Sequence, residues 1–330
     1  METRRLGRTG RDVGVVGLGA WQLGADWGEV DERDALAVLH AAVDAGVTFI
    51  DTADVYGDGR SERLVGQILK ETVSNGSGDL TVATKMGRRV EQIPSNYNLD
   101  AFRAWNDRSR ENLGVDTIDL VQLHCPPTPV YSTDAVFDAL DALVDEGRIA
   151  SYGVSVETCA EALTAIARPN VASIQIILNA FRLKPLDEVL PAAREAGVGI
   201  IARVPLASGL LSGKYDENTT FSADDHRTYN RHGESFDVGE TFSGVDFTTG
   251  LEAVRRLIPA LPTGASMAQF ALRWILDQAG VTVVIPGARN PAQVAANVAA
   301  ADLSPLTEDQ LAAVQQTYDD LIRPQIHNRW

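Results

Sequence analysis

Eight short runs rich in apolar and β-branched residues recur along this chain of 330 residues, and helical patterns separate them. The runs cover residues 13–18, 47–50, 80–83, 118–123, 149–154, 173–178, 199–202 and 281–285. Most of them are continuously apolar, which is typical of parallel strands that are covered on both faces. One run in about 41 residues leaves room for a strand, a helix and two loops in each unit.

This alternation of strands and helices favours an α/β fold of the (β/α)8 TIM-barrel type, with an open doubly wound sheet as the alternative. Residues 3–15 resemble a β-hairpin, which could plug the bottom of the barrel. Residues 205–247, after the seventh strand, form a long stretch rich in Gly and Asp, and loops of this length are usually functional. No linker interrupts the pattern, so we expect a single domain over residues 1–330.

The composition excludes several classes of partner. Acidic residues outnumber basic ones by 45 to 29, which gives a net charge of −16 and disfavours nucleic acid and anionic membranes. The apolar runs are far shorter than the roughly 20 residues of a membrane helix, and the first residues lack a signal-peptide pattern. Cys125 and Cys159 form no disulfide or metal framework, so we expect a cytoplasmic protein without a bound metal.

Four polar residues follow three successive strands of the expected barrel. Asp51 ends the second strand and Tyr56 lies in the glycine-flanked loop after it, while Lys85 and His124 end the third and fourth strands. The separations of 34 residues from Asp51 to Lys85 and 39 from Lys85 to His124 each match one βα unit. Because active sites of such barrels lie at the carboxyl ends of the strands, we expect these side chains to meet.

Together these groups would form a proton donor for a carbonyl oxygen. A free tyrosine has a pKa of about 10 and donates poorly to a developing alkoxide at neutral pH. An ammonium group at Lys85 would stabilise the tyrosinate and lower that pKa, and Asp51 would keep Lys85 charged. His124 could hydrogen-bond the substrate oxygen. A barrel hydrolase with Asp51 and Asp54 as paired carboxylates is an alternative, but it leaves Lys85 unexplained.

The chain resembles the aldo-keto reductase superfamily. The specific signature is Asp51-Thr52-Ala53-x-x-Tyr56-Gly57-x-Gly59-x-Ser61-Glu62, and the match runs from Arg5-Leu6-Gly7 to Ile285-Pro286-Gly287. The resemblance implies a TIM barrel, the catalytic residues Asp51, Tyr56, Lys85 and His124, and hydride transfer between a nicotinamide and an aldehyde, ketone or alcohol. Glu replaces the histidine in relatives that reduce steroid double bonds, so His124 implies carbonyl chemistry.

The expected cofactor is NADPH, with NADH as a possible substitute. Gly17-Leu18-Gly19 lacks the third glycine of a Rossmann fingerprint, because position 22 is Gln. A glycine-rich turn at residues 209–214 and a helix N-terminus beside Arg289 instead suit anionic phosphates. The resemblance assigns these segments to the pyrophosphate and to the adenosine 2′-phosphate with the adenine. The expected cofactor-binding residues are Gly19, Ala20, Trp21, Asp51, Ser155, Gln175, Arg203, Pro205, Leu206, Ser208, Gly209, Leu211, Lys214, Gly287, Arg289, Gln293 and Asn297.

Ser155 and Gln175 could hydrogen-bond the carboxamide of the nicotinamide, and the planar guanidinium of Arg203 could stack on its ring, where relatives carry an aromatic residue. The substrate pocket is expected to contain Trp21, Tyr56, His124 and Cys125, with Trp27 and residues 224–240 as further candidates.

Voltage-gated potassium-channel β-subunits share the fold implied by the resemblance. A cofactor-sensing regulatory subunit is therefore the alternative to a carbonyl reductase. Trp330 could pack over the site or at an interface. The sequence does not identify the substrate or the oligomeric state.

Overall fold

The computed structural model describes residues 1–24, 30–75 and 80–330. In these residues, eight parallel strands pair in the order β10-β9-β8-β7-β6-β5-β4-β3. Parallel bridges from Val16 to Val284 and from Gly19 to Gly287 join the first and last strands, so the sheet closes into the predicted barrel. The strands are β3 (Leu18–Gly19), β4 (Phe49–Asp51), β5 (Thr81–Met86), β6 (Leu120–His124), β7 (Tyr152–Ser155), β8 (Val171–Ile177), β9 (Gly199–Arg203) and β10 (Val281–Val284).

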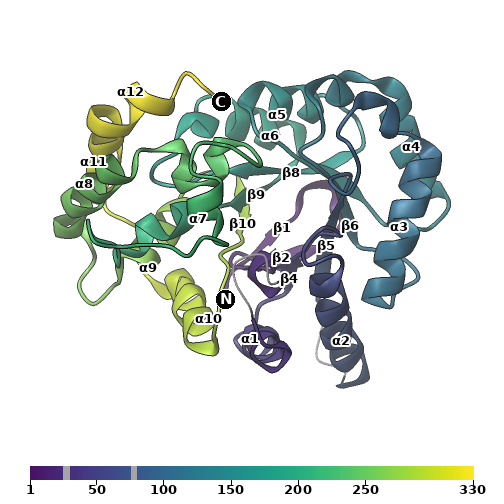
Figure 1. Ribbon diagram of the computed structural model, residues 1–330, viewed down its shortest axis with the longest axis horizontal. Helices are drawn as coiled ribbons and strands as arrows, with labels where there is room; N and C mark the ends of the chain where they lie inside the picture. The colour runs from purple at the N-terminus through teal and green to yellow at the C-terminus, as the bar shows by residue number, and fades with distance from the viewer. Residues whose placement is uncertain (25–29, 76–79) are drawn as a thin grey trace.

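Helices surround the barrel and cover the outer faces of its strands (Figure 1). In α1, the buried residues Ala35, Val38, Leu39 and Ala42 recur at helical spacing, and this stripe packs against the sheet. The longer helices are α1 (Glu32–Asp44), α2 (Arg60–Asn75), α3 (Leu99–Leu113), α4 (Asp134–Asp145), α5 (Cys159–Ile166), α6 (Val189–Ala196), α8 (Phe247–Leu257), α9 (Met267–Leu276), α10 (Pro291–Val298) and α11 (Glu308–Thr317). No helix among the described residues is both long and apolar enough to cross a membrane.

The predicted hairpin closes the bottom of the barrel. Its strands β1 (Thr3–Arg5) and β2 (Asp12–Gly14) are antiparallel. Leu6 and Val13 from this hairpin pack in one buried cluster with strand residues that include Phe49 and Leu120. Side chains alternate in direction along a strand, so this cluster is the lower layer of the barrel interior.

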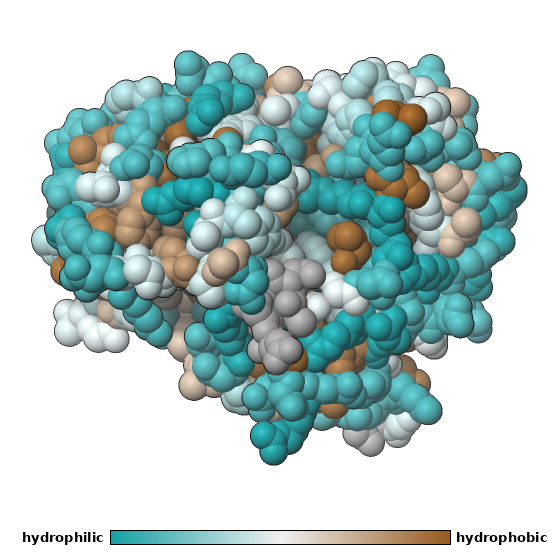
Figure 2. Space-filling model, in the orientation of Figure 1, coloured by the Kyte–Doolittle hydropathy of each residue, from teal (hydrophilic) through white to brown (hydrophobic). Residues whose placement is uncertain are grey.

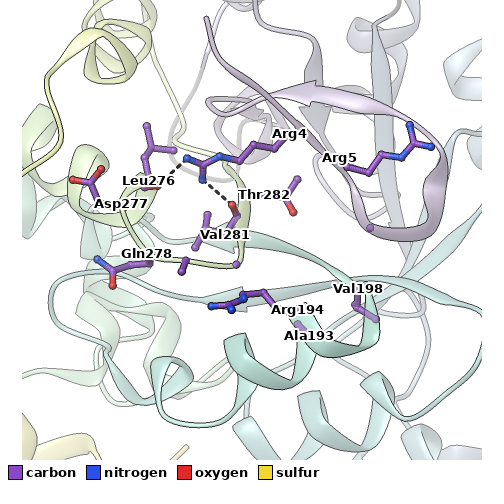
Figure 3. A pocket seen from close by; sticks show the side chains of 14 residues that line it. Arg4, Arg5, Ala193, Arg194, Val198, Leu276, Asp277, Gln278, Val281 and Thr282 are labelled. Carbon is purple, nitrogen blue, oxygen red and sulfur yellow. Dashed lines mark hydrogen bonds between the residues drawn. The ribbon is translucent and has the colours of Figure 1, made fainter.

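Arg4 anchors the hairpin to the rest of the molecule. Its guanidinium donates hydrogen bonds to the carbonyl oxygens of Leu276 (3.0 Å) and Val281 (2.8 Å), as Figure 3 shows. An open hollow of about 460 Å³ lies beside these bonds, and its lining includes Arg194 and Gln278. This hollow is lined by the amino-terminal hairpin and by the segments that precede β9 and β10, so it lies at the end of the barrel opposite the predicted active site.

The first barrel strand differs from the prediction of residues 13–18. The segment is divided: Val13 belongs to the hairpin strand β2, and the barrel strand β3 begins only at Leu18. The physical reason is that residues 12–14 pair with β1 beneath the barrel, so the following residues must first cross to the barrel wall before β3 can begin. Gly19 allows this wall to close tightly, since a Cβ atom there would lie 2.9 Å from the carbonyl oxygen of Ile285.

The long segment after β9 is ordered into short elements, and we call residues 205–247 the mouth loop. It contains the short helix α7 (His226–Tyr229), a short 3-10 helix (Val238–Glu240) and a turn with left-handed backbone at Ser208 and Gly209. Figure 1 places α7 in front of the carboxyl ends of the strands. In Figure 2 the same face is mostly hydrophilic and is hollowed beside the loop.

Candidate active site

The four predicted catalytic residues meet at the carboxyl ends of β4, β5 and β6. The Lys85 ammonium donates hydrogen bonds to the Asp51 carboxylate, to the carbonyl oxygen of Thr52 at 3.0 Å and to the Tyr56 hydroxyl at 3.3 Å. The rings of Tyr56 and His124 lie edge to face, with centroids 5.9 Å apart. Lys85 and Asp51 are only 1 % and 3 % exposed, so this ion pair is screened little by water.

Two glutamine residues hold Asp51 in place: Gln122, which the sequence pattern did not single out, and Gln175, which was expected to contact the nicotinamide. The amide nitrogens of Gln122 (3.1 Å) and Gln175 (2.7 Å) both donate to the Asp51 oxygen that does not face Lys85. Gln122 was detectable, because it is a polar residue in an apolar run and lies two positions before His124 on the same strand. Alternation along the strand places both side chains inside the barrel. The nitrogen of Gln175 is thus committed to Asp51, and any contact with a nicotinamide would use its oxygen.

The pKa values of the phenol and the amine reflect burial and the Asp51 carboxylate. Burial has the largest effect on the Tyr56 pKa and raises it, and the negative charge of Asp51 raises it further. The positive charge of Lys85 lowers the pKa as expected, but by less than burial raises it. The pKa of Tyr56 is therefore raised overall, so the phenol keeps its proton at neutral pH. Burial lowers the pKa of Lys85, but attraction to Asp51 and Tyr56 outweighs burial and raises the pKa overall. The site thus holds an acid and a cation beside it.

His124 is neutral in this environment. Burial lowers the pKa of its imidazole well below the usual value, and the cations Arg88, Lys85 and Arg203 lower it further. Its Nδ1 atom is buried and has no hydrogen-bond partner within the described residues. The indole of Trp21 also stacks on Tyr56, at a centroid distance of 6.0 Å. The phenol is therefore in contact with both an indole and an imidazole.

Arg203 is committed to ion pairs that the sequence did not predict. Its guanidinium contacts Glu157 at 2.8 Å and Glu240 at 3.5 Å, and Arg88 contacts the same carboxylates at 3.1 and 3.2 Å. We call Arg88, Glu157, Arg203 and Glu240 the ionic quartet. Its members come from the ends of three strands and from the mouth loop. The stacking of Arg203 on a nicotinamide stays a prediction. The ion pairs of the quartet fix the position of the guanidinium that would stack.

Cys125 lies next to the quartet, and its thiol is buried and hydrogen-bonded. Its thiol donates to the Ser155 hydroxyl at 3.4 Å, and burial raises the thiol pKa to about 12. The Cys125 sulfur and the carboxylate oxygens of Glu157 and Glu240 lie within 4.8 Å of one another. Both carboxylates are paired with arginine side chains, so we assign no metal to them.

The two predicted phosphate segments lie at the same end of the barrel. Asn290 caps α10 by accepting from the Gln293 amide at 2.9 Å, and Gln293 accepts from the Arg289 amide at 2.7 Å. The Asn297 amide donates to the Gly287 carbonyl oxygen at 3.2 Å. In the other segment Lys214 is exposed, and no contact of its amine is seen within the described ranges.

Ser208 has a second role within the mouth loop. Its hydroxyl donates to the Glu240 carbonyl oxygen at 3.0 Å and accepts from the Phe242 amide at 3.0 Å. The expected contact of this side chain with a pyrophosphate stays a prediction. Its neighbours Pro205, Leu206, Gly209 and Leu211 share the same turn after β9, and Ala20 follows β3 at the barrel mouth. Trp27 lies outside the described residues.

The sequence matches the aldo/keto reductase family over residues 15–319. The chain belongs to the aldo-keto reductases. It is 32 % identical to aldo-keto reductase YhdN of Bacillus subtilis, over 90 % of this chain and 87 % of that protein. It is 31 % identical to a probable voltage-gated potassium channel subunit beta of Oryza sativa, over 96 % of this chain and 97 % of that one. The structure of the glycerol dehydrogenase AKR11B4 from Gluconobacter oxydans superposes with a TM-score of 0.77 at 31 % identity, over 99 % and 97 % of the two chains.

Family membership accounts for the arrangement just described. This aldo-keto reductase is an NAD(P)H-dependent oxidoreductase that interconverts carbonyl compounds and alcohols on a TIM barrel. The hydrolase alternative is wrong, because Asp51 is paired with Lys85 and the two glutamine residues rather than with Asp54.

Proposed function

We propose that this reductase uses NADPH to reduce an aldehyde or ketone to an alcohol, with Tyr56 as the proton donor, and that it also runs in reverse. The observation that carries the proposal is the position of the Lys85 ammonium between the Asp51 carboxylate and the Tyr56 hydroxyl. A phenol that is protonated at rest and lies beside a fixed cation can give up its proton and keep the resulting charge stabilised.

The steps at the protein are simple. The substrate oxygen accepts hydrogen bonds from Tyr56 and from the neutral His124, which together orient the carbonyl. When bound, the nicotinamide supplies the hydride, or accepts it in the reverse reaction. As the substrate oxygen becomes an alkoxide, Tyr56 transfers its proton to it, and Lys85 stabilises the phenolate that remains. Asp51, held by Gln122 and Gln175, keeps Lys85 charged throughout.

The described residues fit a dinucleotide at the barrel mouth. The buried Nε of Arg203 and the Oε1 of Gln22 have no hydrogen-bond partner in the described part of the chain, and Gln22 lies directly against the backbone of Gly287. The N-terminus of α10 and the neighbouring Arg289 suit the 2′-phosphate. Ser155 and Arg203 would contact the nicotinamide, Ser208 and Lys214 the pyrophosphate, and Gln293 and Asn297 the adenosine. Arg289 favours NADPH, and NADH would bind more weakly.

The test is the Tyr56→Phe variant, assayed with a panel of aldehydes, ketones and alcohols that includes glyceraldehyde and glycerol. We expect kcat to fall by a factor of about 10² to 10⁴, the range typical of a lost general acid, while the Kd for NADPH stays the same. The control is Tyr152→Phe, whose hydroxyl donates to Asp141 of α4 outside the barrel. Unchanged turnover in Tyr56→Phe would remove the mechanism.

A second candidate is a regulatory subunit that binds the cofactor as a signal. The similarity to the rice channel subunit supports it, because that match covers nearly the whole of both chains. This candidate requires tight NADPH binding with negligible turnover across the panel. The enzyme proposal requires turnover that depends on Tyr56, so the same assay separates the two.

A further inference from the structure

Trp330, the last residue of the sequence, is packed in a slot formed by the mouth loop and the barrel. Its indole is 6 % exposed and lies 3.7 Å from the guanidinium carbon of Arg182. Two glycines of the loop make room for the ring: a Cβ atom on Gly244 would lie 2.4 Å from the indole, and one on Gly239 would lie 3.1 Å from it. The slot therefore accepts a planar ring only because both loop positions lack a side chain.

The indole also makes a charge-assisted hydrogen bond to the loop. Its Nε1 donates to both oxygens of Asp237, at 3.0 and 3.2 Å. The same Asp237 caps the 3-10 helix Val238–Glu240 by accepting from the Gly239 amide at 2.7 Å. One carboxylate thus links Trp330 to the element that carries Glu240.

The loop residues on either side of Asp237 contact residues of the active site. Phe236 packs edge to face on Trp21, with centroids 5.9 Å apart, and Trp21 stacks on Tyr56. Glu240 completes the ionic quartet and contributes to the electrostatic environment of Tyr56. Arg182, beneath the indole, donates to the Glu157 carbonyl oxygen at 3.1 Å, so a second path joins Trp330 to the quartet.

We propose that Trp330 is a positioning residue of the active site. By holding Asp237, it fixes the loop segment 236–240, so that Phe236 supports the Trp21–Tyr56 stack and Glu240 stays in the quartet beside His124. The inference rests on the proposed function where it concerns catalysis. The fixing of the loop is independent of that function and can be measured without turnover.

The experiment compares Trp330→Ala, Trp330→Phe and Asp237→Asn with the unaltered protein. Hydrogen exchange of the backbone at residues 225–245 reports the loop, and NADPH dissociation and the kinetic constants report the site. The control is Asn328→Ala, an exposed change two residues away. Trp330→Phe keeps a ring over Arg182 but loses the N–H donor. Asp237→Asn keeps an acceptor for the indole and loses the charge.

We expect Trp330→Ala to accelerate exchange in this segment by about tenfold or more, because hydrogen bonds to charged groups are among the stronger ones. NADPH should dissociate faster and KM should rise more than kcat falls, with the Phe and Asn variants intermediate. Normal exchange in both Trp330→Phe and Trp330→Ala would overturn the inference. If Trp330→Ala does not fold, the test uses Trp330→Phe and Asp237→Asn instead. Normal exchange in both of these variants would then overturn the inference. Faster exchange in a protein without turnover would support the fixing of the loop and reject the proposed function.

Discussion

Asp54 provides a quantitative test of the electrostatics in the loop that carries Tyr56. Its side chain is 1 % exposed, and neither carboxylate oxygen has a hydrogen-bond partner among the residues that the structure describes. Burial raises the pKa of this carboxyl from the ordinary 3.8 to about 8, and repulsion from Glu62 adds to the effect. Asp54 is therefore protonated in the folded protein at neutral pH, whereas in the unfolded chain it is ionised.

This shift makes folding stability depend on pH. The protonated carboxyl contributes stability that is fully present below pH 3.8 and is lost as the pH rises through about 8. At about 1.4 kcal/mol per pH unit, the wild-type protein loses about 4 kcal/mol between pH 5 and pH 8 through this one group. Asparagine has nearly the same shape and does not titrate, so Asp54→Asn should not show this loss.

The assay is urea unfolding of both proteins at pH 5, 6, 7 and 8. The free energy of unfolding of Asp54→Asn, relative to wild type, should rise by about 4 kcal/mol across this range. Asp44→Asn, an exposed change at the end of α1 that removes the same charge, is the control. A pH-independent difference for Asp54→Asn would refute the reasoning, because the buried carboxyl would then have an ordinary pKa.

Two further predictions concern the proposed reaction. Lys85→Met should lower kcat by about 100-fold or more, because the phenolate of Tyr56 loses its cation, and fluorescence titration should show an unchanged Kd for NADPH. An equal loss of kcat and of NADPH affinity would contradict this role. Arg289→Ala should weaken NADPH binding by about 10- to 100-fold and NADH binding far less, since only NADPH carries the 2′-phosphate. Arg255→Ala on α8 is the control, and equal losses for both cofactors would show that Arg289 does not contact the phosphate.

The sequence predicted the barrel and the meeting of the four candidate catalytic residues, because both depend on regular periodicity. Parallel strands bring their carboxyl ends to one edge, so residues that end successive strands must be neighbours whatever the loops do. The same rule could have identified Gln122, which shares a strand and a direction with His124. The hairpin plug followed from its turn and from its place before the first unit. The start of the first barrel strand was missed, because apolar residues at 13–18 serve both the hairpin and the wall.

The ionic quartet could not be predicted in this way. Glu157 and Glu240 are 83 residues apart, and Glu240 lies in a loop of irregular backbone, where no periodicity relates sequence position to direction. The family resemblance assigned Arg203 to the cofactor, and only the folded structure shows that Glu157 and Glu240 pair with its guanidinium. The packing of Trp330 is of the same kind, because it depends on glycines at 239 and 244 that meet an indole from the end of the chain.

The pKa of Tyr56 shows why the separate contributions must be added in the folded protein. Lys85 alone would lower the pKa of the phenol. Lys85 stays protonated in its buried position because Asp51 is beside it, and the same carboxylate raises the pKa of Tyr56. Lys85 and Asp51 together therefore shift the pKa of Tyr56 less than Lys85 alone would. Its effect is greatest once the proton has left, because the new phenolate then lies 3.3 Å from a fixed ammonium group. An arrangement of this kind stabilises the state in which Tyr56 is charged without requiring that it be charged at rest.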